Sequence, residues 1–333
     1  MSLFDRFKKQ GNAKSIYKKY DEFMELGEYE KALECLDKAL ELNPENMNAW
    51  NNKAVVFRKL GKYEEELKCY VKSLEINPDD ADIWYNKGVT LQQLGRYEDA
   101  LESYNMTLNL DQTYIKAWNN KGIVLKNLNK YEEALKSYNE VLKLNPKDIY
   151  AWNNKAVVFG KLGKYEEELK CYVKSLEINP DDADIWYNKG VTLQQLGRYE
   201  ESLKSYDIAL KVEKTHIATL NNKSVVLRNM RRYDEALKCL DKVLELDPNK
   251  VEAIANKGLT FKELGKFQEY LNCFNKVLEL DPNNRTGWYN KGLALDKLGK
   301  HEEALKCLDK SLILDPDFEP AKKARKEILS SIS

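Results

Sequence analysis

Apolar and small residues recur along this chain in two short helical periods, one on each side of a glycine. In residues 81–114, the first period places Trp84 and Gly88 on one helical face, and the second, after Gly95, places Tyr104 at the equivalent point. Glycine is common just beyond the end of a helix, and in most copies Asn-Pro or Asp-Pro then stops the second period. Each segment is therefore predicted to form a hairpin of two helices.

This pattern returns every 34 residues. Seven of the eight prolines are spaced by 34 or 68 residues, all six tryptophans fall at repeat position 4, and all six cysteines fall at position 23. A single hairpin cannot cover its own apolar face, so the period predicts a solenoid whose stacked neighbours bury a continuous core. Nine repeats are predicted: 13–46, 47–80, 81–114, 115–148, 149–182, 183–216, 217–250, 251–284 and 285–318.

The two ends of the chain differ from the repeats. Residues 1–12 are predicted to be a separate N-terminal segment. Residues 319–333 place Ala321, Ala324 and Ile328 on one helical face and basic residues on the rest. They are predicted to form a capping helix, because the last repeat of an array has no further neighbour to cover its seam.

The repeat motif resembles that of the tetratricopeptide repeat (TPR) family, W-x2-L-G-x2-Y followed by A, F and P, and it covers about nine-tenths of the chain. The resemblance implies an all-α, right-handed α-solenoid superhelix that binds proteins and is not an enzyme. The first repeat carries Tyr20 where a small residue is usual, which leaves its packing open. Lysine replaces the family's leucine at position 7 in Lys53, Lys87, Lys121, Lys155, Lys189, Lys223, Lys257 and Lys291, and we leave its role open.

A long internal duplication also favours a binding array. Residues 49–104 recur as 151–206 with four differences: Arg58/Gly160, Asp99/Glu201, Ala100/Ser202 and Glu102/Lys204. A catalytic centre needs different groups converging on one reacting atom, whereas doubling a segment extends a surface that already binds. The duplication thus argues against an enzyme.

The charge composition disfavours polyanionic partners. Lys+Arg and Asp+Glu are both 54, so no net field would draw the chain to nucleic acid or to a membrane surface. The first residues lack the apolar core of a secretory signal, and no run approaches the roughly 20 apolar residues of a membrane span. We expect a cytoplasmic protein.

Chemistry is sparse. The only histidines, His216 and His301, are too far apart in the array for a metal cluster or a triad, and no phosphate-binding glycine loop is present. The six cysteines, each on a different hairpin, are expected to be free thiols, because packed helices hold them farther apart than a disulfide permits. No cofactor, metal or small-molecule substrate is expected.

Candidate binding residues lie on the first helix of each repeat. Position 6 points away from the partner helix, and an aliphatic residue at position 9 lies beside it. Position 6 is asparagine in Asn52, Asn86, Asn120, Asn154, Asn188, Asn222, Asn256 and Asn290. This column resembles the asparagine ladder of the TPR domain of O-linked N-acetylglucosamine transferases, which implies binding of a peptide main chain. Packing between repeats explains the asparagines equally well at this stage.

Three tyrosines at position 5, Tyr85, Tyr187 and Tyr289, recur every 102 residues and are predicted to anchor apolar side chains of a bound peptide. We expect a scaffold that binds extended or helical segments of partner proteins. Single-stranded RNA binding and service as an accessory subunit of an enzyme supplied in trans are the alternatives. The chaperone-binding carboxylate clamp is not supported, since position 9 is never asparagine.

Overall fold

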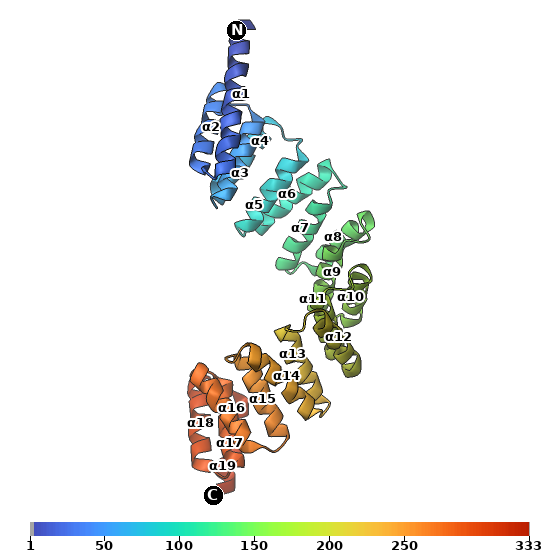
Figure 1. Cartoon of the computed structure of the whole chain (residues 1–333), viewed down its shortest axis with the longest axis vertical. Coiled ribbons are helices and arrows are strands. Elements are labelled where there is room, and N and C mark those ends of the chain that lie inside the picture. The colour runs from blue at the N-terminus through green and yellow to red at the C-terminus, as the bar shows by residue number, and fades with distance from the viewer. Residues whose placement is uncertain (1–2, 333) are drawn as a thin grey trace. The chain divides into compact units, whose positions relative to one another are not determined.

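The computed structural model describes residues 3–332, and within that range all regular secondary structure is helical. The helices α1 to α19 follow one another along the chain (Figure 1). The first eighteen form nine consecutive pairs and the last is a C-terminal helix, so the predicted all-α repeat architecture is confirmed. Residues 1–2 of the predicted N-terminal segment and residue 333 of the predicted cap lie outside the described residues.

The chain divides into two compact units, residues 1–162 and 163–333, with the boundary inside the fifth pair. The helices of the first unit are α1 (Leu3–Leu26), α2 (Tyr29–Leu42), α3 (Met47–Lys59), α4 (Tyr63–Ile76), α5 (Ala81–Gln93), α6 (Tyr97–Leu110), α7 (Ile115–Asn127), α8 (Tyr131–Leu144) and α9 (Ile149–Lys161). The first helix of a later pair has 13 residues and the second has 14.

The second unit continues the same alternation. Its helices are α10 (Tyr165–Ile178), α11 (Ala183–Gln195), α12 (Tyr199–Val212), α13 (Ile217–Asn229), α14 (Tyr233–Leu246), α15 (Val251–Glu263), α16 (Phe267–Leu280), α17 (Arg285–Lys297), α18 (His301–Leu314) and α19 (Glu319–Ile332).

The turn inside each pair is set by repeat position 15. Seven of the nine residues there are glycines with φ between 69° and 77°, a left-handed conformation that costs glycine little. The other two are Asn129 and Arg231, which adopt φ of 58° and 61°. The sequence pattern therefore fixes this turn even where glycine is replaced.

Most first helices from α3 to α17 begin with a side-chain cap at the last position of the preceding repeat, whereas α7 and α15 have none. Asp80 accepts a hydrogen bond from the Ile83 amide at 3.1 Å, and the residues at the same repeat position act alike in four further pairs. His216 fills this role through Nδ1, 3.2 Å from the Thr219 amide. The last residue of the loop between these repeats is thus hydrogen-bonded to a backbone amide in the first turn of the helix that follows.

In the first unit, aromatic residues of the second helices fill the seam. Tyr104 of α6 is fully buried in a cluster with Leu91 of α5 and Val124 of α7. Gly88 makes room for this ring, since a β-carbon there would lie 2.6 Å from it. The small residue at position 8 is therefore a packing requirement.

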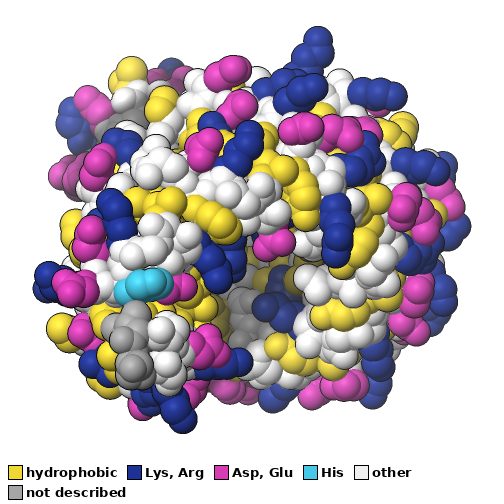
Figure 2. All heavy atoms as spheres, turned by 90° about the horizontal axis from the view of Figure 1, so that it is seen from below, with side chains coloured by type: hydrophobic (Ala, Val, Ile, Leu, Met, Phe, Trp, Pro, Cys, Tyr) yellow, Lys and Arg dark blue, Asp and Glu magenta, His cyan; other side chains and the backbone are white. Residues whose placement is uncertain are grey.

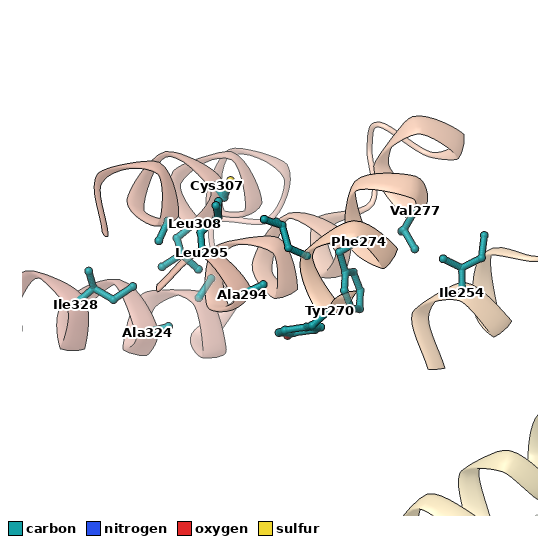
Figure 3. Close-up of a cluster of buried hydrophobic side chains, with 13 residues drawn as sticks. Ile254, Tyr270, Phe274, Val277, Ala294, Leu295, Cys307, Leu308, Ala324 and Ile328 are labelled. Carbon is teal, nitrogen blue, oxygen red and sulfur yellow. The ribbon is translucent and has the colours of Figure 1, made fainter. Parts of the chain in front are cut away.

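In the second unit, a cluster extends over the last pairs to the C-terminal helix (Figure 3). It includes Tyr270 of α16, Leu295 of α17 and Leu308 of α18. Ala324 and Ile328 of α19 are buried in the same cluster. The apolar face read from the sequence is thus the face by which α19 covers the end of the array.

The first pair differs from the expectation at its start. Helix α1 begins at Leu3, so most of the segment predicted to be separate is continuous with the first helix. Tyr20 replaces the usual small residue, yet it is buried with Leu36 of α2 and lies edge-on to Tyr17 at 6.5 Å. The first repeat therefore packs as a helix pair around an aromatic residue.

Candidate peptide-binding face

The eight asparagines at position 6, here called the Asn column, lie on the first helices of the second to ninth pairs. Seven are half-buried, while Asn290 is only 5% exposed. Within each unit some successive first helices touch, as α5 does α7 in the first unit and α11 does α13 in the second. The aliphatic residues at position 9 accompany the column, and Val55 and Val157 are the most exposed of them, at 38%.

In the first unit, the Asn column is bonded to one of the predicted tyrosines. The Asn120 side-chain amide donates to the Tyr85 hydroxyl at 3.2 Å across neighbouring pairs. The Tyr85 ring lies 6.0 Å from that of the buried Tyr104 and 5.0 Å from that of Tyr114. Tyr114 in turn donates to Asp82 at 2.6 Å. Tyr85 is thus half-buried and held on several sides.

The second unit repeats this arrangement. Asn222 donates to the Tyr187 hydroxyl at 3.0 Å, and the Tyr187 ring lies 6.2 Å from Tyr206 and 5.4 Å from the His216 ring. His216 Nε2 lies 3.1 Å from an Asp184 carboxylate oxygen. Because Nδ1 accepts the Thr219 amide, the neutral ring carries its proton on Nε2 and donates to Asp184. The two clusters differ by an imidazole in place of a phenol.

A polar network joins α13 and α15 through a pair of residues with the same separation in sequence as the Tyr–Asn pairs, but with no aromatic residue. Asn256 donates to Asn221 Oδ1 at 3.0 Å, and Asn221 donates to Glu252 at 2.8 Å. Arg228 donates to Asn256 Oδ1 at 3.3 Å. Neither Asn221 nor Arg228 was among the predicted site residues. The signal that could have found Asn221 is its separation of 35 residues from Asn256, the same as in the Tyr–Asn pairs.

The remaining asparagines fall into two groups. Asn154 accepts a hydrogen bond from Lys126 Nζ at 3.3 Å. Within residues 14–331, no side-chain hydrogen bond is recorded for Asn52, Asn86 or Asn188. The donor and acceptor groups of these three carboxamides are therefore available to bind a ligand.

The expectation that position 6 points outward is wrong for Asn290. This side chain is buried because Tyr270 replaces a small residue on the neighbouring helix and donates its hydroxyl to Asn290 Oδ1 at 2.7 Å. Asn290 itself donates to the Thr286 carbonyl at 2.8 Å. Its neighbour Tyr289 remains half-buried, with its ring edge-on to Phe318 at 5.4 Å.

The lysines at position 7, whose role the sequence left open, cover the tryptophans. Lys87 Nζ lies 4.5 Å from the Trp84 ring centre, and five further lysines lie over the equivalent tryptophan. Lys257 forms an ion pair with Asp241 of the preceding helix at 2.6 Å. Burial lowers the pKa of Lys87. Most of these lysines therefore cover a tryptophan of their own helix, and Lys53, Lys223 and Lys257 pair with an aspartate of the preceding helix.

An open cleft of about 640 Å³ lies near the C-terminal end of the second unit. Phe267 and Leu293 form apolar parts of its lining, and Lys262 and Glu327 contribute opposite charges. Leu293 occupies position 9, so this cleft adjoins the same side of the first helices as the Asn column. Its mixed lining suits a peptide better than a compact apolar ligand.

Reactive chemistry is scarce among the described residues. In this part of the chain no group of His, Cys, Asp and Glu has the arrangement of a metal site, and no helix is long and apolar enough to cross a membrane. No disulfide joins any of the six cysteines, all of which lie within the described residues. Burial raises the pKa of Cys69 to about 12, which keeps its thiol protonated at neutral pH.

Opposite charges are interspersed over the surface. Figure 2 shows basic and acidic side chains alternating across the face in view, with apolar patches between them. Many of these charges pair locally, as Arg96 does with Asp99 at 2.6 Å. The described surface thus agrees with the charge balance of the sequence and offers no extended basic path in this view.

Family models match nearly the whole array. A tetratricopeptide repeat model matches residues 81–114, 115–148, 183–216 and 286–318. Further models described as tetratricopeptide or TPR repeats match 21–61, 54–95, 137–170, 158–197, 217–250 and 251–284. The chain belongs to the TPR family. The comparison of this TPR protein with curated proteins found no match.

Solved structures resemble the TPR array at low sequence identity. A TPR protein from Parabacteroides merdae is 19% identical with a TM-score of 0.59, over 75% of this chain and 98% of that one. The anaphase-promoting complex hetero-tetramer Cut9–Hcn1 gives 19% and 0.55, over 90% of this chain and 59% of that one. YrrB, described as a TPR protein with an unusual peptide-binding site, is 26% identical with a TM-score of 0.47, over 58% of this chain and 99% of that one.

This TPR protein spans only 59% of the matched Cut9–Hcn1 chain. At 19% identity, the likeness to that chain and to the Parabacteroides merdae protein shows the fold alone. Which partner the protein binds must therefore be argued from its own residues.

Proposed function

We propose that this TPR protein is a non-enzymatic scaffold that binds an extended or helical segment of a partner protein along the side of its first helices. The carrying observation is the Asn column, whose half-buried carboxamides lie beside the aliphatic residues of position 9. A carboxamide offers both a donor and an acceptor to a peptide unit, while the aliphatic side chains offer contact to apolar groups.

The asparagines of the column are proposed to have two different roles, according to their hydrogen bonds. Asn120 and Asn222 are oriented by the tyrosines of the preceding pairs, at 3.2 and 3.0 Å. Asn52, Asn86 and Asn188 have no recorded side-chain bond within residues 14–331 and are the ones that hold the partner's main chain in this proposal. Tyr85, Tyr187 and Tyr289 present half-buried rings to apolar side chains of the partner.

The test uses a peptide selected from a random library on the full chain and titrated by calorimetry. Replacing Asn52, Asn86 and Asn188 together by alanine should weaken binding roughly tenfold to a thousandfold, since each lost hydrogen bond contributes about 0.5–1.5 kcal/mol. The matched control replaces Asn105, Asn109 and Asn139, which are exposed on second helices. Equal affinity of both triple variants would contradict the proposal.

Single-stranded RNA binding is the rival from another class. It would need cations free to contact phosphates, but Lys87 and its equivalents lie over tryptophan rings, and Lys257 pairs with Asp241. A salt titration separates the two, because phosphate contacts weaken steeply as salt rises. Six cysteines with no disulfide among the described residues fit a reducing compartment such as the cytoplasm. Service as an accessory subunit of an enzyme supplied in trans is compatible with the same scaffold role.

A further inference from the structure

The internal duplication contains one change that removes a charged group from a buried contact. In the first copy, Glu66 is 0% exposed and its Oε1 accepts from Arg58 Nε at 2.7 Å and from Arg58 Nη2 at 2.6 Å. The same oxygen accepts from Thr90 Oγ1 at 2.8 Å. Arg58 also lies 3.2 Å from the Tyr70 hydroxyl. The carboxylate is thus enclosed by a guanidinium, a phenol and a threonine.

The second copy keeps every member of this group except the guanidinium. Its carboxyl is Glu168, its phenol Tyr172 and its threonine Thr192, but the residue equivalent to Arg58 is Gly160, which has no side chain. Another difference between the copies, Asp99/Glu201, preserves an ion pair to the neighbouring arginine, at 2.6 and 2.7 Å. The Arg58/Gly160 change, in contrast, is not conservative, because it removes the charged side chain.

Glu168 is consequently a half-buried carboxyl with neutral partners. Hydrogen bonds link it to Thr192 and Tyr172 within the second unit. Among the described residues, no lysine, arginine or histidine forms an ion pair with it. Burial raises its pKa, and the two hydrogen bonds oppose that shift. Unlike Glu66, it is partly open to solvent.

We propose that Glu168 and Tyr172 bind the guanidinium group of an arginine side chain on the partner segment, while Thr192 holds the carboxylate in place. This inference rests on the proposed function, because the arginine arrives on the peptide that the first helices hold. In effect, the partner supplies in trans the group that Arg58 supplies within the first copy.

The register of the site supports this assignment. Thr192 lies one helical turn after Asn188 and donates to the Asn188 carbonyl at 3.0 Å. Asn188 is one of the three asparagines proposed to hold the partner's main chain. Asn188 and Glu168 thus lie on the adjacent helices α11 and α10, which are joined by the hydrogen bond between Thr192 and Glu168.

The contacts of the first copy select arginine over lysine. Arg58 uses both Nε and Nη2 on the carboxylate, and Nη2 also faces the Tyr70 hydroxyl. Only a planar guanidinium offers several donors in this fixed arrangement, whereas an ammonium is a compact charge with no such fork. The site therefore distinguishes the two cations by geometry as well as charge.

The experiment titrates the full chain with N-acetyl-arginine N-methylamide, followed by nuclear magnetic resonance of carboxyl-labelled glutamate. The citrulline analogue, which has nearly the same shape without the charge, is the control probe. The wild-type chain should bind the arginine probe saturably at the Glu168 signal. Glu168→Gln should weaken binding roughly tenfold to a hundredfold, in the range for hydrogen bonds to charged groups.

A variant of the first copy, within the first unit, tests the comparison between the copies. Arg58→Gly should create a second site at Glu66. Absence of binding to the wild-type chain, equal binding of citrulline, or unchanged binding by Glu168→Gln would overturn the proposal. If Arg58→Gly unfolds, as circular dichroism would reveal, Glu168→Gln alone decides.

The outcome is separable from that of the proposed function. Loss of the arginine site with peptide binding still sensitive to the triple asparagine variant would overturn only the guanidinium assignment. Probe binding at Glu168 with peptide binding insensitive to the asparagines would overturn only the main-chain proposal.

Discussion

The side-chain amide of Asn120 donates to the hydroxyl of Tyr85, which lies 35 residues earlier in the chain. The copy in the second unit joins Asn222 to Tyr187 at the same separation. A separation of one repeat plus one residue connects position 5 of one hairpin to position 6 of the next. The same hydrogen bond therefore joins neighbouring hairpins in both copies of the duplicated segment.

Removing the Tyr85 hydroxyl should lower stability. Tyr85→Phe keeps the ring packed on Tyr104 but leaves the Asn120 amide without its acceptor, at a cost of about 0.5–1.5 kcal/mol. Thermal melts followed by circular dichroism measure this loss. Tyr289→Phe is the control, since among the described residues no hydrogen bond of its hydroxyl is recorded. Equal melting temperatures for the two variants would show that the Asn120 bond adds nothing.

Replacing Arg231 by glycine should raise stability by about 1 kcal/mol. Arg231 adopts a φ of 61°, a conformation that costs about 1–2 kcal/mol for a residue with a β-carbon. Asn129→Gly should gain less, because asparagine tolerates this region better. Urea unfolding of both variants beside the wild-type chain gives the comparison. A loss of stability in Arg231→Gly would mean that its side chain makes contacts outweighing the strain.

Much of this fold could be predicted from periodicity alone. The helix boundaries follow the spacing of proline, tryptophan and the residue at position 15, because each has a local role: ending a helix, bonding the preceding loop, or adopting positive φ. Trp84 Nε1, for instance, donates to the Pro78 carbonyl at 2.8 Å. Such roles depend on neighbours close in sequence, so a pattern reveals them.

The site was harder to predict because it depends on which groups meet across repeats. Helical projection placed Asn290 outward, but one substitution on another helix, Tyr270, buried it. The sequence pattern did not determine whether the lysines of position 7 contact a ligand or a tryptophan. Arg228 and Asn221 belong to a network whose members are four different repeat positions, so no single column of the sequence reveals it.

Deleting one internal repeat should leave a folded protein with a lower melting temperature. Removing residues 115–148 takes out α7 and α8 together, and the flanking hairpins retain complementary faces because each contacts only its neighbours. Removing residues 115–130 alone takes out α7 without α8 and should disrupt packing far more. Circular dichroism melts compare the two. Complete unfolding of the 34-residue deletion would contradict an array stabilised by neighbours.

The cysteines should differ in reactivity although no disulfide joins them within the described residues. Cys273 is partly exposed and burial raises its pKa to about 11, while Cys69 is buried with a pKa of about 12. Both thiols are protonated at neutral pH, so modification is slow, and Cys273 should react first. Thiol titration should find one faster group in the native chain and six in denaturant. Cys273→Ser, which places at position 23 the serine found in other repeats, should remove the faster phase.

The last prediction concerns the pH dependence of Glu168. Burial raises the pKa of this carboxyl in the folded chain above its unfolded value, about 4.3. Below that pH, folded and unfolded chains both hold the proton, and the stabilising contribution of the neutral carboxyl is fully present. As pH rises, the unfolded chain loses its proton first, so the contribution is lost as pH rises through the folded pKa.

Glutamine cannot titrate, so the difference in unfolding free energy between wild type and Glu168→Gln should shift against the wild type from about pH 4 upward. Glu167→Gln, at an exposed neighbouring position, is the matched control and should track the wild type. Urea titrations from pH 4 to 8 measure all three chains. A difference that stays constant over this range would mean that Glu168 has the same proton affinity in the folded and unfolded chains. Saturating arginine probe should reverse the trend, because a bound guanidinium favours the ionised carboxylate.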